Sequence, residues 1–158
     1  EVIADMRLLF IDATFDFERI ASLIRSVARQ RKLDIVAVDY IQLCEITLGK
    51  NDSREREIAT MSRRFKKLAK SLKLPIVIGS QLNRESVKRG KPTLADMRES
   101  GAIEQDSSVV ILLSKSEDDE DTLIDVAKHR GGPTGEIKML LNGPKFRFES
   151  NYEQYDKM

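Results

Sequence analysis

Short runs of apolar and often β-branched residues recur along the chain, and longer amphipathic stretches separate them. Four of the runs are almost continuously apolar, which is typical of strands that are buried on both faces of a parallel sheet. Each run ends on or near a polar side chain. We therefore predict four parallel strands, namely MRLLFID (6–12), LDIVAVD (33–39), LPIVIGSQ (74–81) and SSVVILLSK (107–115).

Two of the intervening stretches have the period of an amphipathic helix. Apolar residues in 16–30 recur at intervals of three and four, and Asp16 is placed to cap the first turn. The stretch 54–72 repeats this pattern behind Ser53, and its opposite face is basic. An alternation of strands and helices predicts right-handed parallel crossovers, which build an α/β fold.

The region after the fourth run has a different pattern. Two further apolar segments, 122–130 and 135–142, are joined by the sequence GGPTG. Gly and Pro in so short a connection predict an antiparallel hairpin. The predicted fold class is therefore α/β, with a mostly parallel sheet flanked by helices and an antiparallel hairpin near the C-terminus.

The composition is that of a globular protein, and it does not by itself indicate a binding partner. The 158 residues are 41% hydrophobic, which suits one compact domain with a core. The net charge is +1, so a nucleic-acid site has to come from local clusters of basic residues. The single cysteine, Cys44, excludes an internal disulfide and favours a reducing, intracellular compartment. No apolar run approaches the ~20 residues that span a bilayer, so no membrane partner is expected.

The ends of the second and third predicted strands carry the first candidate chemistry. In open parallel sheets, ligands bind beyond the carboxyl ends of the strands, where Asp39, Ser80 and Gln81 would project. Asp39 suits a hydrated Mg²⁺ ion, as in the Walker B arrangement of nucleotide hydrolases. Gln81 suits a γ-phosphate or its attacking water. The alternatives are a strand-terminal carboxylate that caps the next loop and an ordinary polar strand end; Asp12 also ends a predicted strand.

A second candidate lies in AKHRGGPTG, residues 127–135. Lys128 and Arg130 are two residues apart on a strand, so their side chains point to the same face. Two cations at a hairpin tip can reach a phosphate in a neighbouring subunit, as an arginine finger does. The alternative is a basic strand edge that blocks aggregation. His129 points the other way, and we interpret it as structural.

Two basic loops are the third candidate. In RESGAIEQDSS (98–108), Gly101 permits a close backbone approach or a helix start, and Arg98 lies beside it. Loops of this kind can follow a phosphate backbone. No aromatic residue lies in 82–107, so contacts would go to phosphates with little sequence preference. The other basic residues of the two loops are Arg84, Lys88, Arg89 and Lys91.

Taken in order, these segments resemble the replicative DNA helicases of the DnaB family. The likeness runs from about Leu8 to Phe148 and rests on four sequences: IVAVDYIQL, SREREIATMSRRFKKLAKSLKLPIVIGSQLNR, LADMRESGAIEQDSSVVILL and AKHRGGPTGEIKMLL. Each motif alone is weak, but the series is specific. The resemblance implies a RecA-like motor domain that uses ATP and Mg²⁺, works as a homohexameric ring on single-stranded DNA, and meets a primase and a helicase loader in the bacterial or phage-infected cytoplasm.

The resemblance also implies roles for individual residues. Asp39 becomes the Walker B carboxylate, close to Mg²⁺ and bound to it through water. Gln81 becomes the γ-phosphate sensor, and Lys128 and Arg130 become the pair that reaches the ATP of the adjacent subunit. These four residues are the expected catalytic and nucleotide-binding set. The expected DNA-binding residues are Arg84, Arg98, Glu99 and Gly101.

One family feature has no match in the sequence, namely the P-loop, a Gly-rich turn ending in Gly-Lys-Thr or Gly-Lys-Ser. The family places it upstream of residue 1, and the chain opens on Glu1 instead of Met. We therefore expect residues 1–158 to be a partial RecA-like ATPase domain of an ATP-dependent DNA helicase. By itself the chain should bind ATP poorly and hydrolyse none, and its sheet should leave an apolar face uncovered.

Two other functions remain open from the sequence. A RecA-type ATPase of recombination or clock signalling would have the same fold without unwinding DNA. A non-catalytic module that assembles with partners would agree with the unmatched P-loop.

Overall fold

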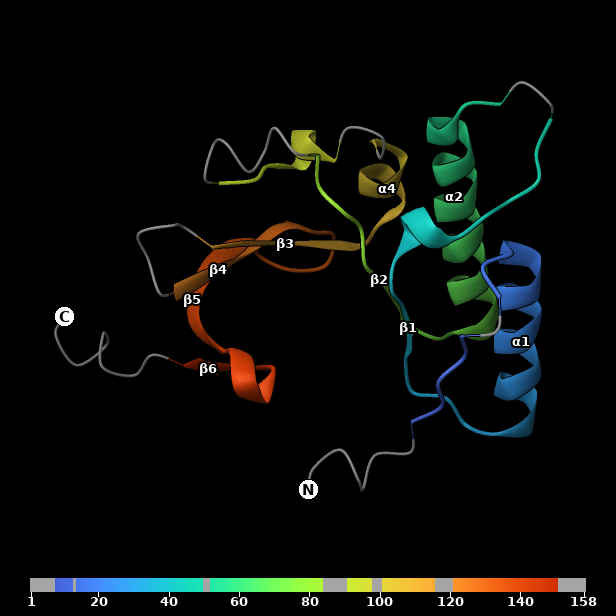
Figure 1. The fold of residues 1–158 in the computed structure, drawn as a ribbon, viewed down its shortest axis with the longest axis horizontal. Helices are drawn as coiled ribbons and strands as arrows, with labels where there is room; N and C mark the ends of the chain where they lie inside the picture. The colour runs from blue at the N-terminus through green and yellow to red at the C-terminus, as the bar shows by residue number, and fades with distance from the viewer. Residues whose placement is uncertain are drawn as a thin grey trace, which may run out of the picture. The chain divides into compact units, whose positions relative to one another are not determined.

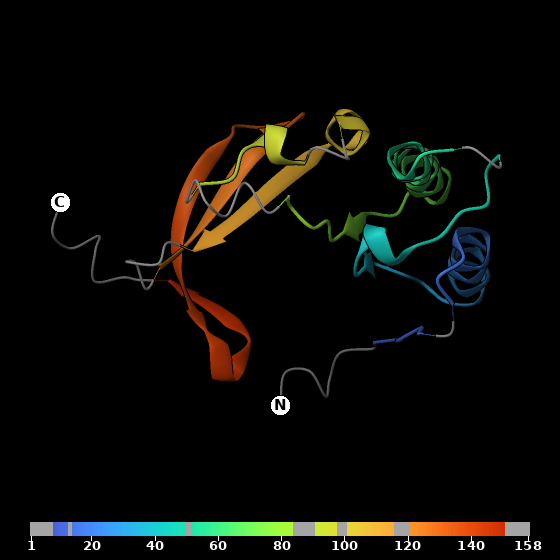
Figure 2. The ribbon, with the colours of Figure 1, turned by 45° about the horizontal axis from the view of Figure 1, so that its top comes forward.

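The computed structural model describes residues 8–12, 14–49, 52–83, 91–97, 101–115 and 121–150. The chain divides into two units, Glu1–Gly79 and Ser80–Met158. Figures 1 and 2 show helices with a short parallel sheet in the first unit and an antiparallel sheet in the second. None of the helices that the structure describes is long and apolar enough to cross a membrane.

The helices of the first unit begin where the sequence predicts. Helix α1 (Phe17–Gln30) has Asp16 as its N-cap, and the Asp16 carboxylate accepts a hydrogen bond from the backbone N–H of Arg19 at 2.9 Å. Helix α2 (Arg54–Leu72) has Ser53 as its N-cap. Both caps satisfy backbone donors that the first turn leaves without helical partners.

The core of the first unit lies along the apolar stripes of these helices. The rings of Phe17 on α1 and Phe65 on α2 pack edge to face, with centroids 4.9 Å apart. Both side chains are buried, as are Ile24 on α1 and Met61 on α2. The 3₁₀ segment η1 (Ile41–Leu43) adds the buried Ile41 to the same unit.

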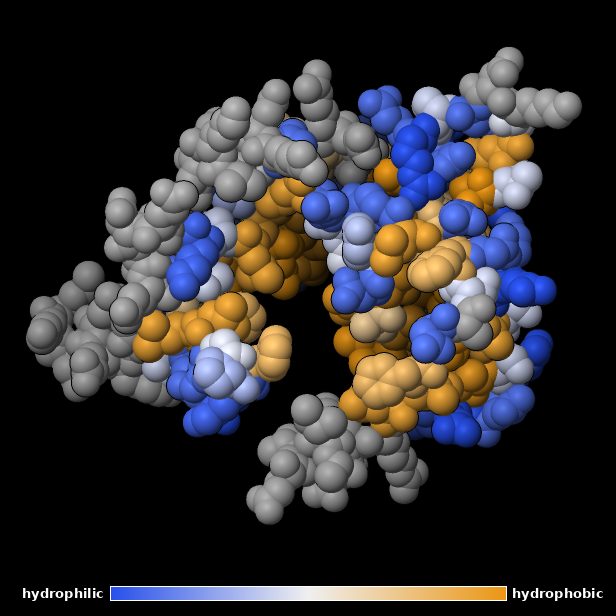
Figure 3. All heavy atoms as spheres, viewed as in Figure 1, coloured by the Kyte–Doolittle hydropathy of each residue, from blue (hydrophilic) through white to orange (hydrophobic). Residues whose placement is uncertain are grey.

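Two short strands of the first unit pair in parallel. They are β1 (Val36–Val38) and β2 (Ile76–Ile78), with Ala37 opposite Val77. Ile35 and Val77 remain exposed, and Figure 3 shows apolar side chains at the surface of this unit in orange. An apolar face of the sheet is thus uncovered within the unit, as the sequence predicts.

The predicted strand at 6–12 is wrong for the residues that are described. Residues 8–12 have no strand geometry, and Leu8, Leu9, Phe10 and Ile11 are exposed. An apolar run indicates burial in a sheet only if a neighbouring strand supplies hydrogen bonds to its backbone. No partner strand pairs with 8–12 among the described residues.

The second unit is an antiparallel sheet in the order β3-β4-β5-β6. Its strands are β3 (Val109–Lys115), β4 (Asp121–His129), β5 (Gly135–Asn142) and β6 (Arg147–Ser150). The predicted hairpin of β4 and β5 is confirmed. Strand β6 was not predicted, because a run of four residues with two charges carries no apolar period.

Strand β3 corrects the prediction of a fourth parallel strand. It pairs antiparallel with β4, and Val110 and Leu112 are buried while Val109, Ile111 and Leu113 are exposed. An antiparallel sheet with one covered face normally shows alternating polarity in its sequence. Here apolar residues occupy both faces, so the run looks like a strand of a parallel sheet.

Candidate functional site

Asp39 lies directly after β1, where the ends of the two parallel strands are joined by backbone hydrogen bonds. The N–H of Gly79 donates to the carbonyl of Val38 at 2.9 Å, and the N–H of Ile41 donates to the carbonyl of Gly79 at 3.0 Å. The Asp39–Tyr40 peptide bond is cis. The side chain of Asp39 is exposed at this edge. The predicted position of Asp39 at the carboxyl end of a parallel strand is confirmed.

Gly79 lies close to that carboxylate. A Cβ atom at residue 79 would lie 3.3 Å from Cβ of Tyr40 and 3.4 Å from Oδ1 of Asp39. The first distance is tighter than ordinary van der Waals contact, so a larger residue would press on the Asp39–Tyr40 segment. Asp39 could be named from the sequence, but Gly79, which follows the neighbouring strand in the sequence IVIGSQ, was missed.

The edge suits a magnesium ion of the kind that nucleotide hydrolases bind. Mg²⁺ keeps several waters and takes one or two carboxylates together with phosphate oxygens. Asp39 offers one exposed carboxylate at the end of a parallel strand. The described residues contain no group of three His, Cys, Asp or Glu side chains that could hold a metal ion by themselves. A site completed by water and a nucleotide agrees with both observations.

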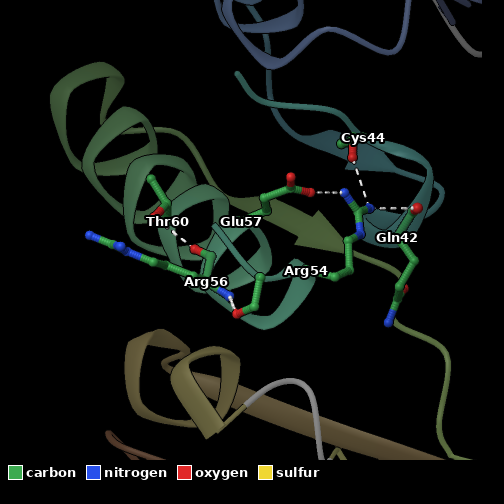
Figure 4. Close-up of polar contacts among 7 residues, drawn as sticks. Gln42, Cys44, Arg54, Arg56, Glu57 and Thr60 are labelled. Atoms are coloured by element: carbon green, nitrogen blue, oxygen red, sulfur yellow. Dashed lines mark hydrogen bonds and ion pairs between the residues drawn. The ribbon is translucent and has the colours of Figure 1, made fainter. Parts of the chain in front are cut away.

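Arg54 joins the segment after Asp39 to the start of α2 (Figure 4). Its Nη2 donates to the carbonyls of Gln42 at 2.8 Å and Cys44 at 3.0 Å, while Nη1 pairs with the carboxylate of Glu57 at 2.6 Å. From the sequence, Arg54 counted only as part of a basic helix face. Its spacing to Glu57, at i and i+3, agrees with the ion pair but gives no sign of the two main-chain acceptors.

Cys44 belongs to this same segment. Its side chain is only 3% exposed, which agrees with a packing role for the thiol. Burial raises the pKa of the Cys44 thiol, and the positive charge of Arg54 acts in the opposite direction. The thiol therefore lies in a covered, weakly reactive environment close to the guanidinium.

Lys128 and Arg130 lie together in the second unit, as predicted. The Lys128 ammonium donates to the carbonyl of Glu104, and the Arg130 guanidinium donates to the carbonyl of Gln105. These carbonyls belong to helix α4 (Gly101–Asp106). Cations at a helix C-terminus satisfy carbonyls that lack helical partners and complement the helix dipole.

The pairing of β3 with β4 contains a β-bulge near the end of β4. Val110 pairs with Lys128 whereas Ile111 pairs with Val126, so Ala127 is an extra residue on β4. A bulge of this kind turns the following side chains to a new direction. Nδ1 of His129 lies 3.2 Å from the carbonyl of Pro133 in the turn after β4, which supports the structural interpretation of this histidine.

The remaining predicted site residues are placed only in part. Gln81 lies beyond β2 with an exposed side chain, and it belongs to the second unit. Gly101 is the first residue of α4, and a Cβ there would meet nothing within 4 Å. The predicted helix start at Gly101 is therefore confirmed. Arg84, Arg98 and Glu99 lie outside the described residues.

The comparison with protein families gives one match that covers most of the chain. Residues 1–150 match the family described as DnaB-like helicase C terminal domain. The chain is also 44% identical over 140 residues to the replicative DNA helicase DnaB of Leifsonia xyli subsp. xyli, which covers 79% of the chain. The chain spans 30% of the length of that helicase.

Solved structures agree with this match. A structure described as an ATPase domain has a TM-score of 0.80 and 33% sequence identity, over 89% of the chain and 53% of that protein. A DnaB-like replicative helicase described with its interactions with primase has a TM-score of 0.79 and the same identity, over 89% of the chain and 36% of that protein. The predicted α/β, RecA-like fold class is confirmed by these likenesses.

Proposed function

Because the chain belongs to the family of DnaB-like helicase C-terminal domains, we propose that it is part of the ATP-driven motor of a replicative DNA helicase. The observation that carries this proposal is the exposed carboxylate of Asp39 at the end of a parallel strand. The family match favours this function over a recombination or signalling ATPase. It also favours a motor over a purely structural module.

In this proposal, Asp39 holds Mg²⁺ through water at the edge of the sheet. The ion supplies positive charge to the phosphates of bound ATP. Gln81 orients the attacking water near the γ-phosphate. Lys128 and Arg130 act across a subunit boundary, where their charges offset the negative charge that develops on the transferred phosphoryl group.

DNA contacts are proposed for the two basic loops that contain Arg84 and Arg98. Arg84 and Arg98 would pair with phosphates of single-stranded DNA, Glu99 would shape the same loop, and Gly101 would start the helix behind it. Phosphate contacts carry no sequence information, so the motor can move along any strand. We propose a homohexameric ring that meets a primase and a loader in the cytoplasm of a bacterial or phage-infected cell.

The test uses a hybrid helicase in which this chain replaces the matching segment of the Leifsonia xyli relative. The hybrid supplies a P-loop, for which residues 1–158 contain no match. We expect DNA-stimulated ATP hydrolysis and fork unwinding from the hybrid. We expect neither from the 158 residues alone, which should also bind a fluorescent ATP analogue poorly.

Mixed rings test whether Arg130 acts on a neighbouring subunit. Arg130→Ala should lower hydrolysis by about 1000-fold or more, because an arginine finger contributes that much. Asp39→Ala should also inactivate the ring. Mixing the two inactive variants should restore part of the activity, since some boundaries then combine an intact Asp39 with an intact Arg130. Lys145→Ala, an exposed change on the same unit, is the matched control. Absence of any recovery would exclude a role in trans.

A further inference from the structure

Arg54 makes a three-way contact that the motor function does not require by itself. One guanidinium nitrogen bonds two main-chain carbonyls, those of Gln42 and Cys44, and another pairs with Glu57 (Figure 4). The Arg54 side chain is 39% exposed and that of Glu57 is 27% exposed. Hydrogen bonds from a charged donor are among the stronger ones, and partial burial protects them from screening.

The segment that Arg54 holds lies shortly after Asp39 in the chain. Upstream of the arginine contacts, the N–H of Ile41 is fixed to the carbonyl of Gly79 at 3.0 Å. Downstream, the N–H of Glu45 donates to the carbonyl of Phe15 at 2.8 Å. Arg54 bonds the stretch between these two anchors. Its hydrogen bonds therefore attach this stretch to α2.

Helix α2 gives that attachment a rigid base. Arg54 is its first residue, behind the Ser53 cap, and Glu57 lies one turn further along. Ile58 and Met61 anchor the same part of the helix in the core. A side chain on a helix that is capped and packed keeps a better-defined position than one on a loop.

We propose that Arg54 is a positioning residue for the Asp39 carboxylate. This rests on the proposed role of Asp39 in holding Mg²⁺. Arg54 fixes η1, and η1 and the Gly79 contact together fix the direction in which the chain leaves β1. Partners behind a metal-binding side chain commonly alter metal affinity or activity by about 10- to 100-fold when they are removed.

The first test measures how well Cys44 is protected in the chain itself. Cys44 is the single cysteine and is buried within the held segment, so its alkylation rate under native conditions reports opening of this segment. Arg54→Ala should raise the rate about tenfold or more. Loss of the Arg54 charge alone would raise the thiol pKa further and slow the reaction, so an acceleration identifies increased exposure.

Two further variants separate this effect from a general loss of charge. Arg56→Ala removes a neighbouring arginine that is 72% exposed and pairs with Asp52, and it should leave the alkylation rate unchanged. Arg54→Lys keeps the charge but loses the planar fork that reaches two carbonyls, so its rate should lie between those of the parent and Arg54→Ala. Circular dichroism confirms that each variant is folded. An unchanged rate in folded Arg54→Ala overturns the proposal.

The second test measures the Mg²⁺ concentration at which the hybrid helicase reaches half of its maximal hydrolysis rate. Arg54→Ala should raise this concentration about tenfold, and Arg56→Ala should not. Faster alkylation with an unchanged Mg²⁺ requirement would make Arg54 merely structural and overturn its positioning role. If Asp39→Ala also kept the parent's Mg²⁺ requirement, the proposed function would fail instead. The two failures are therefore distinguishable.

Discussion

Charged side chains lie at the end of β1 and at the end of β4, and the contacts that fix them differ between the two places. Asp39 makes no hydrogen bond or ion pair within the described part of the chain; the main chain around it is held by Gly79 and Arg54. Lys128 and Arg130 are themselves bonded, to the carbonyls of Glu104 and Gln105. The first arrangement leaves a carboxylate ready for a ligand. In the second, the cations have to exchange protein carbonyls for a ligand.

This difference affects how the two regions should respond to a nucleotide. We expect Asp39 to bind without rearranging its own contacts, because its side chain has none to exchange within the described residues. Release of Lys128 and Arg130 would leave the carbonyls at the end of α4 without these donors, which has a cost. Their reach towards a phosphate should therefore depend on α4, which begins at Gly101 in the proposed DNA-binding loop.

The largest effect on stability and hydrolysis is expected from a side chain at residue 79, beside the Asp39–Tyr40 segment. Gly79→Val places atoms against Tyr40 and the Asp39 carboxylate, so the free energy of unfolding should fall by about 1–3 kcal/mol. Hydrolysis by the hybrid helicase should fall by about 100-fold, because a displacement of the order of 1 Å is enough for such a loss. Urea unfolding and single-turnover hydrolysis measure the two effects.

Gly101→Ala is the matched control for stability. A Cβ at residue 101 would meet nothing within 4 Å among the described residues, and alanine leaves the unfolded chain fewer conformations than glycine. The same kind of substitution should therefore raise the free energy of unfolding, by about 0.4–1 kcal/mol. If both glycine variants were stabilised, the close contact at Gly79 would be disproved.

The sequence was most informative where local chemistry decides the structure. Caps at Asp16 and Ser53 follow from side-chain oxygens that satisfy the first turn of a helix, and the hairpin follows from Gly and Pro in its turn. The direction of β3 could not be predicted. Pairing depends on which strand is the neighbour, and an apolar run contains no information about that.

The candidate site shows the same limit. Asp39, Lys128 and Arg130 could be named because each stands at the end of an apolar run in the sequence. Arg54 could not be separated from the basic residues beside it on α2, because its role depends on two main-chain carbonyls ten and twelve positions earlier. Main-chain acceptors occur at every residue, so no sequence pattern marks them.

A smaller effect is expected at the end of α4. The hydroxyl of Ser107 donates to the carbonyl of Ile103 at 2.6 Å, and Ile103 directly precedes the two residues that receive Lys128 and Arg130. Ser107→Ala removes this bond and should lower the free energy of unfolding by about 1 kcal/mol. Ser26→Ala, which alters an exposed bond to Gln30 on α1, is the control and should change it less. Equal losses in the two variants would show that the hydrogen bond at the end of α4 contributes no more to stability than an exposed one on α1.

The smallest effect concerns pH and the segment behind Asp39. Because burial raises the pKa of Cys44 in the folded state, the folded chain keeps the thiol proton at pH values where the unfolded chain releases it. The resulting contribution to stability is complete below the pKa of the unfolded thiol and is lost as the pH rises through the folded value. Urea unfolding at a series of alkaline pH values should therefore show a decline in stability that Cys44→Ala reduces.

Other groups titrate in the same range, so the informative quantity is the difference in the free energy of unfolding between the two proteins at each pH. A difference that stays constant across the series would mean that the thiol is not buried in solution.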